Sequence, residues 1–279
     1  MTGSNDFVLV DRPRPHVALV TLNRPERMNS MAFDVMVPLK AALDAITVDN
    51  EVRAVVLTGA GVGFSSGADH KSAGSVPHVA GLTRPSFGLR SMEVLDECIL
   101  ALRKLHQPVI AAVNGAAIGG GLCLALAADI RVASTTAYFR AAGINNGLTA
   151  SELGLSYLLP RAIGSSRAFE IMLTGRDVGA EEAERIGLVS RQVPAEELLD
   201  TCYAIAERIA AFSRPGTELT KRTLWSGLDA GSLEAHMQAE GLGQLYIRLL
   251  TSNFEEAVAA RKDKRPPVFT DDKRETGSG

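Results

Sequence analysis

Short apolar runs rich in β-branched residues alternate along this chain with longer segments whose apolar residues recur at helical spacing. A period of two or an unbroken apolar run is typical of strands, and recurrence every three to four residues is typical of amphipathic helices. Such alternation predicts an α/β architecture. The pattern predicts strands at 17–22, 53–58, 109–113 and 130–133, and helices at 33–49, 91–105 and 120–128.

The pattern becomes mostly helical after Ser166. Earlier in the chain, the stretch 71–85 is rich in Gly, Ser and Pro. This composition predicts a mobile loop, which is a candidate lid. The tail from Lys262 carries Pro266, Pro267 and many charges, so we expect its end to fray. Further helices are expected at 168–173, 180–186, 195–212, 216–228 and 232–261.

Composition narrows the class of protein. A chain of 279 residues with 46% hydrophobic content can bury a full core, as one large domain or one domain with an appendage. A net charge of −3, 5% aromatic residues and the lack of a long basic run argue against a nucleic-acid-binding surface. Three cysteines without a C-x-x-C pair suggest neither a disulfide framework nor a zinc site.

Targeting signals are not apparent in the sequence. The first residues lack a basic region followed by an apolar core, which predicts no signal peptide and a cytoplasmic protein. The run 109–128 is long and apolar enough to be a candidate for a membrane-spanning helix. Its glycines, Gly115 and Gly119 to Gly121, favour a strand, a turn and a helix instead, so no membrane contact is expected.

Candidate chemistry lies in two glycine-rich segments that each follow a buried strand. In one, the strand 109–113 leads through Gly119-Gly120-Gly121 into an apolar helix, whose free N–H groups and positive dipole end would face an anion. In the other, the strand 54–59 leads to a loop that ends at Lys71. One backbone amide from each segment could share a single oxygen. Alternatively, the three glycines serve only close packing of helix on strand.

With the block Leu22 to Ser30, these segments resemble the crotonase (enoyl-CoA hydratase/isomerase) superfamily, and the later blocks 173–176 and 180–190 fit it as well. The resemblance covers residues 8 to 265. It implies an α/β fold, a crotonase-like spiral of ββα units over 1–193, with a C-terminal helical oligomerisation region over 194–265 and a flexible tail over 266–279. It also implies a homotrimer, or a hexamer that is a dimer of trimers.

The same resemblance implies an acyl-CoA thioester substrate, from fatty-acid metabolism, whose carbonyl becomes an enolate. Coenzyme A would be part of the substrate, with no separate cofactor and no metal. The N–H groups of Ala68 and Gly120 would hold the enolate oxygen. The run Ala68, Asp69, His70, Lys71 matches the CoA-binding segment of the family, in which a lysine lies near the phosphates. For Asp69 we favour a helix-capping role.

Two arginines of the first block, Arg24 and Arg27, are further candidates for the CoA phosphates, because guanidinium groups match phosphate geometry. A solvated surface role is the alternative for each.

The acid and base residues depart from the family pattern. Family hydratases use two glutamates, and the matching positions here are Cys123 and Gly143, so hydration of a double bond is unsupported. We expect Cys123 to pack as a small buried hydrophobe. Glu152 is the candidate general acid/base, because an acyl chain beside it would disfavour its charged form. Alternatively, Glu152 starts a helix that Ser151 caps. Asn145 and Asn146 are weaker candidates for orienting a water or the thioester.

Rival classes fit less well. Ser65 lies in a G-x-S-x-G run, but a loop separates it from the preceding strand, unlike a hydrolase elbow. Residues 59–64 imitate a dinucleotide fingerprint that has Phe64 in place of its last glycine. The serious rival is a crotonase-fold protein that binds acyl-CoA without turning it over. We expect an enzyme with isomerase or other lyase-type chemistry.

Overall fold

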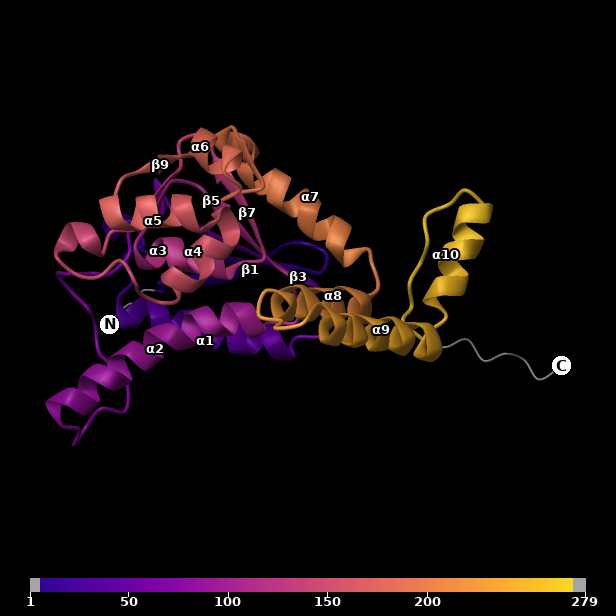
Figure 1. Ribbon diagram of the computed structural model, residues 1–279, viewed down its shortest axis with the longest axis horizontal. Helices are drawn as coiled ribbons and strands as arrows, with labels where there is room; N and C mark the ends of the chain where they lie inside the picture. The colour runs from indigo at the N-terminus through magenta and orange to yellow at the C-terminus, as the bar shows by residue number, and fades with distance from the viewer. Residues whose placement is uncertain (1–5, 273–279) are drawn as a thin grey trace.

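Three consecutive strand–strand–helix units form the body of the protein, in a computed structural model that describes residues 6–272. Each unit sends its first strand to one sheet and its second strand to another, so the chain advances as a spiral (Figure 1). The units are β3 (Ala54–Gly59), β4 (Gly63–Ser65) and α2 (Arg84–Lys104); β5 (Val109–Val113), β6 (Ala116–Ile118) and α3 (Gly120–Ala127); and β7 (Ile130–Ser134), β8 (Tyr138–Arg140) and α4 (Leu155–Ile163).

The larger sheet has the strand order β1-β2-β3-β5-β7-β10, and the smaller sheet has the order β4-β6-β8-β9. In the larger sheet β1 (Val8–Arg14) is the antiparallel edge strand, and β2 (Val17–Leu22), β3, β5, β7 and β10 (Arg191–Val193) are parallel. In the smaller sheet β4, β6 and β8 are parallel and β9 (Val178–Gly179) is antiparallel to β8. The spiral of ββα units is therefore confirmed.

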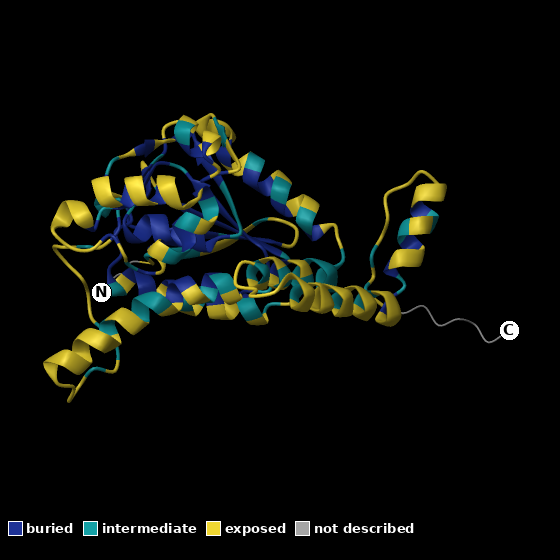
Figure 2. Cartoon of the chain, in the orientation of Figure 1, coloured by how far each residue is buried: buried dark blue, intermediate teal, exposed yellow. Residues whose placement is uncertain are grey.

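The core lies on both faces of the larger sheet, because successive side chains of a strand point to opposite faces. Val55 and Leu57 pack with α1 (Phe33–Val48), α2 and α3. Ala54 and Val56 pack on the other face against α7 (Leu198–Ala210). Figure 2 shows these strands buried between the two layers of helices.

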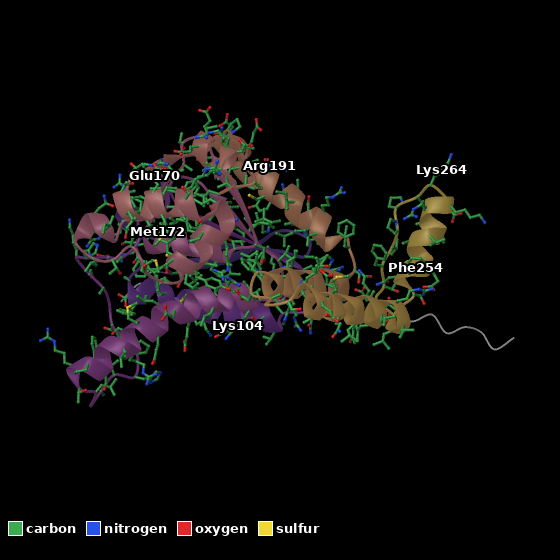
Figure 3. The ribbon with its side chains drawn as sticks, in the orientation of Figure 1. Lys104, Glu170, Met172, Arg191, Phe254 and Lys264 are labelled. Atoms are coloured by element: carbon green, nitrogen blue, oxygen red, sulfur yellow. The ribbon has the colours of Figure 1, made fainter. Side chains whose placement is uncertain are left out.

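The remaining helices cover the end of the chain: α5 (Ser165–Thr174), α6 (Ala180–Arg185), α8 (Arg214–Gly227), α9 (Leu233–Leu250) and α10 (Asn253–Lys262), with short 3-10 turns at Pro25–Arg27, Ile144–Asn146 and Ala195–Glu197. No residue of α9 is buried, and Figure 2 shows it as a largely exposed rod. Helix α10 stands apart from the body of the molecule, and Figure 3 marks Phe254 on it.

Helix α8 is attached to the core by an ion pair between the buried Lys221 and the half-buried Asp129. The Nζ atom of Lys221 lies 2.8 Å from Oδ2 of Asp129, which follows α3, and donates to the carbonyl of Gln107 at 3.0 Å. The other Asp129 oxygen accepts the indole N–H of Trp225 at 2.6 Å. The Asp129 carboxylate thus binds two side chains of α8.

Several predicted boundaries are corrected by the structure. Helix α2 begins at Arg84 rather than 91, because the Thr83 side chain accepts the N–H of Ser86 as a cap. The helix predicted over 232–261 is two helices, which break at Thr251 and Ser252.

The segment 109–128 is a strand pair and a short helix, and no helix within 6–272 is long and apolar enough to cross a membrane. In the predicted tail, the Asp271 carboxylate accepts the N–H of Arg214 at 3.0 Å, whereas 273–279 lie outside the described residues.

Candidate active site

The candidate site lies where three strands of the smaller sheet end. Because β4, β6 and β8 are parallel neighbours, their carboxyl ends meet at one edge. The chain after β4 reaches Ala68, the chain after β6 reaches Gly120, and the loop after β8 leads to Glu152. The three predicted catalytic positions therefore come from three successive turns of the spiral.

The amide of Ala68 is oriented by a backbone bridge to Met31. The N–H of Met31 donates to the carbonyl of Gly67 at 2.7 Å, and the N–H of Asp69 donates to the carbonyl of Met31 at 3.3 Å. In parallel pairing, the residue between these two bonds directs its own N–H to the opposite side. The Ala68 N–H therefore points away from Met31, and Ala68 itself is exposed.

The Gly67 backbone runs close to the second amide. A Cβ at Gly67 would lie 2.6 Å from the carbonyl oxygen of Ile118 and 3.3 Å from the nitrogen of Gly120, and the φ of Gly67 is +79°. Only glycine meets both conditions without strain.

Gly120 is the first residue of α3, so its N–H has no acceptor within the helix and lies at the positive end of the helix dipole. A Cβ on Gly120 would overlap Sδ of Met31, and one on Gly121 would overlap the carbonyl oxygen of Ser65. The glycines thus allow close packing of the helix on its neighbours, which is the alternative role that the sequence suggests for them. The same packing brings the Gly120 amide beside the Ala68 segment.

Asp69 anchors the loop that carries Ala68. One of its oxygens accepts the N–H groups of Lys71 and Ser72, both at 2.9 Å; the other accepts Nη1 of Arg24 at 2.9 Å and the Ser30 hydroxyl at 3.2 Å. The Asp69 side chain is only 4% exposed. Burial alone would raise the pKa of Asp69, but these donors bring it down to about 2. The carboxylate therefore holds a turn, and the expected helix-capping role is wrong because the next helix begins only at Arg84.

The predicted CoA-binding residues divide into two groups. Arg24 is buried, engaged with Asp69 and stacked over the Phe7 ring, so the solvated surface role is wrong for it, and its contact with the CoA phosphates stays a prediction. Arg27 is half-buried, and His70 and Lys71 are exposed on the segment after Asp69. Contact of Arg27, His70 and Lys71 with coenzyme A stays a prediction.

Glu152 lies beside the start of α3. A Cβ on Gly119 would be 3.1 Å from Oε1 of Glu152, so the carboxyl group lies next to Gly119, the residue before Gly120. Burial raises the pKa of Glu152, and the nearby His70 opposes this rise. Helix α4 begins at Leu155 with Gly154 at its cap position, so the alternative in which Ser151 caps a helix started by Glu152 is wrong.

The two positions that we expect to match the hydratase glutamates, Cys123 and Gly143, carry no carboxylate. Cys123 is fully buried, its Sγ donates to the carbonyl of Glu152 at 3.5 Å, and burial raises its pKa well above the ordinary value. At Gly143 a Cβ would overlap the carbonyl oxygen of Thr149, so the loop has no room for a side chain there. The thiol instead holds the backbone of the candidate acid.

The weaker candidates have structural partners. Ser65 is buried and donates to the carbonyl of Asn29 at 2.8 Å, and Asn145 donates to the carbonyl of Gly175 at 3.2 Å. Sequence reasoning missed Met31 and Leu153, which pack against Gly120, because only the folded chain brings them there. Among residues 6–272 no group of three His, Cys, Asp or Glu side chains is placed to hold a metal ion.

Comparison with known proteins shows the family of this chain. Residues 13–273 match the protein family described as enoyl-CoA hydratase/isomerase. A relative from Mycobacterium tuberculosis (strain H37Rv), named "Probable enoyl-CoA hydratase EchA12", is 83% identical over 95% of this chain and 93% of its own length.

Two solved structures are similar as well. A probable enoyl-CoA hydratase/isomerase from Mycobacterium abscessus is 74% identical, with a TM-score of 0.92 over 96% of this chain and 100% of that one. A protein described as a monofunctional enoyl CoA isomerase from M. smegmatis is 70% identical, with a TM-score of 0.71 over 83% of this chain and 98% of that one. The chain therefore belongs to the enoyl-CoA hydratase/isomerase family.

Proposed function

We propose that this protein is an enoyl-CoA isomerase that moves the double bond of a 3-enoyl-CoA into conjugation with the thioester. The observation that carries the proposal is the position of the Glu152 carboxyl group beside Gly119, the residue before the Gly120 amide, with a buried thiol at Cys123 and no side-chain space at Gly143. One carboxyl group beside two backbone donors suffices for proton transfer next to a thioester.

The two amides would act on the thioester oxygen. When a proton leaves C2, negative charge develops on that oxygen, and the N–H groups of Ala68 and Gly120 stabilise it without reorganising. The Glu152 carboxylate accepts the C2 proton, the C2 electron pair forms the new C2–C3 double bond, and the former C3–C4 pair takes up a proton at C4. A carboxyl group that carried the proton from C2 to C4 would end the cycle ionised again.

Hydration needs more than this site supplies. Water must be activated on one side of the double bond while a proton is delivered on the other, a task that family hydratases give to two glutamates. The Cys123 thiol stays protonated because burial raises its pKa, and Gly143 has no titratable group. The description of one relative as a monofunctional isomerase supports the same choice.

The test is turnover of 3-enoyl-CoA and 2-enoyl-CoA substrates of several chain lengths by the purified full chain, followed through the absorbance of the conjugated thioester. We expect 3-enoyl substrates to be consumed and crotonyl-CoA to be left essentially unhydrated. Glu152→Gln should lower kcat by about 10²-fold or more, the usual effect of losing a general base. Rapid hydration that survives Glu152→Gln would overturn the proposal.

A second variant tests whether hydration can be restored. In Cys123→Glu one hydratase carboxylate returns, but Gly143 still cannot carry the other, so we expect no gain of hydration. The rival function, binding of acyl-CoA without turnover, is less favoured because the relatives carry enzyme names. Calorimetric binding of an acyl-CoA with no turnover of any substrate would support it instead.

We further propose that coenzyme A enters only as part of the substrate, with no separate cofactor, and that Lys71 and Arg27 contact its phosphates. A cytoplasmic location and a trimer, or a hexamer of two trimers, complete the proposal. The apolar residues exposed along α9 support the assembly.

A further inference from the structure

Leu153, the residue after the candidate acid, has a strained backbone conformation. Its φ is +45°, in the left-handed region that a leucine side chain disfavours. Gly154 follows with a φ of +80°, which glycine adopts without strain. A strained residue persists only where the surrounding structure imposes its conformation, and such residues are frequent at functional sites. The backbone at Leu153 therefore needs a structural cause.

The Leu153 side chain is anchored on the start of α3. Leu153 is only 8% exposed, and its Cδ1 atom would be 3.2 Å from a Cβ built on Gly120, so the side chain packs against this glycine. The Sδ atom of Met31 packs against the same glycine. Relaxation of the strained backbone would move the buried leucine side chain away from Gly120.

The peptide group before Leu153 is fixed as well. The carbonyl oxygen of Glu152 accepts the N–H of Leu155 at 2.7 Å and the Cys123 thiol at 3.5 Å. Leu155 is the first residue of α4, and Cys123 lies in α3. The strained residue is therefore held between two contacts, the carbonyl group before it and its own side chain.

Two consecutive side chains reach two consecutive glycines. The Glu152 carboxyl group lies against Gly119. The Leu153 side chain lies against Gly120, the next residue. In an extended segment, consecutive side chains point to opposite sides. The left-handed turn at Leu153 instead brings both side chains to the start of α3, where the acid and one proposed amide donor meet.

We infer that Leu153 is a positioning residue of this active site, whose side chain, packed on Gly120, holds the backbone turn that directs the Glu152 carboxyl group to Gly119. This inference rests on the proposed role of Glu152 in isomerisation. Leu153 does not react itself. It sets the spacing between the carboxyl group that accepts the C2 proton and the Gly120 amide, and the rate of proton transfer depends on such spacing.

The experiment compares crystal structures and steady-state kinetics of variants of the full chain. Leu153→Ala removes the contact with Gly120, so we expect the Glu152 carboxyl group to leave its place at the start of α3. The kcat for a 3-enoyl-CoA should fall by about 10- to 100-fold while KM changes little, because only the transition state loses an interaction. Leu153→Met keeps a long apolar side chain and should recover most of the kcat. If Leu153→Ala does not fold, Leu153→Gly removes the same contact from a backbone without strain.

The matched control is Leu159→Ala, which removes the same atoms from a fully buried leucine of α4. It should lower the free energy of unfolding but leave kcat and the place of the Glu152 carboxyl group unchanged. A carboxyl group that stays against Gly119 in Leu153→Ala, or an equal loss of kcat in the control, would overturn the inference. A carboxyl group that moves, in an enzyme whose turnover is unaffected by Glu152→Gln, would uphold the positioning and contradict the proposed function.

Discussion

At the scale of single residues, the site depends on atoms that glycine leaves out. A Cβ on Gly67 would lie 2.6 Å from the backbone carbonyl oxygen of Ile118, and Gly67 has a φ of +79°. In Gly67→Ala we therefore expect the neighbouring Ala68 amide to be displaced and kcat to fall by about 10² to 10³, as when one donor of such a hole is lost. Steady-state kinetics measure this. Gly179→Ala is the control, because a Cβ there meets nothing within 4 Å, and equal losses in both variants would contradict the explanation.

The low pKa of Asp69 leads to a prediction about how the stability of the fold depends on pH. Its folded-state pKa, about 2, is below the ordinary 3.8, so the ionised carboxylate stabilises the fold above about pH 4, and this contribution is lost as the pH falls toward 2. Thermal unfolding of the wild type and Asp69→Asn should therefore differ most above pH 5, and the two curves should converge between pH 4 and 2. A constant gap down to about pH 2 would show that Asp69 does not titrate as described.

Arg24 forms an ion pair with Asp69 and so helps to hold the same turn. Arg24→Met leaves the Asp69 carboxylate without its cation and loosens the turn behind the Ala68 amide. We expect kcat to fall while the KM for acyl-CoA changes little, because the amide acts on charge that develops only in the transition state. A rise in KM alone, measured on the same substrate, would instead support the phosphate-binding role first considered for Arg24.

At the scale of elements, the attachment of α8 is open to test. Lys221→Met leaves the half-buried Asp129 carboxylate without its cation, which should cost about 2–3 kcal/mol of unfolding free energy. Asp129→Asn added to Lys221→Met should recover part of that loss. Urea unfolding measures both, and Lys40→Met, which removes an exposed pair with Asp44, should cost less than about 1 kcal/mol.

Long elements were predictable from the sequence, and short ones were not. The strands 17–22 and 109–113 match β2 and β5 end for end, because a buried parallel strand is a continuous apolar run. Strands β4, β6 and β8 have three residues each, too few to display any period. Helix α4 contains Pro160, which weakens its helical signal, and it was missed.

The site was predictable only in part for a related reason. Ala68, Gly120 and Glu152 stand in local motifs, so a single sequence can suggest them. The bonds that orient them join residues far apart in the chain, such as Arg24 with Asp69 and Cys123 with Glu152. Such pairs produce no regular spacing in the sequence. For this reason the sequence alone suggests a helix cap for Asp69, and its contact with Arg24 cannot be predicted.

At the scale of the whole molecule, the exposed apolar side chains of α9 predict assembly. Leu242, Leu245 and Leu249 are each more than half exposed and recur at helical spacing, a stripe that a lone protein would leave in water. We expect sedimentation to give a trimer or hexamer, and Leu245→Glu with Leu249→Glu to shift it toward the monomer. Val62→Glu, at an isolated exposed position, should leave the assembly intact. A wild-type monomer at micromolar concentration would refute this.

The main-chain origin of the two proposed donors has a consequence for inhibition. A compound that places an anionic oxygen between the Ala68 and Gly120 amides would bind N–H groups that every amino acid except proline carries, so resistance would not be expected to arise by exchanging a contacting side chain. Displacing the donors would require a larger residue at Gly67 or Gly120, and each such change collides with neighbouring atoms that hold the site together. Escape mutations at this point should therefore carry a heavy loss of the enzyme's own turnover.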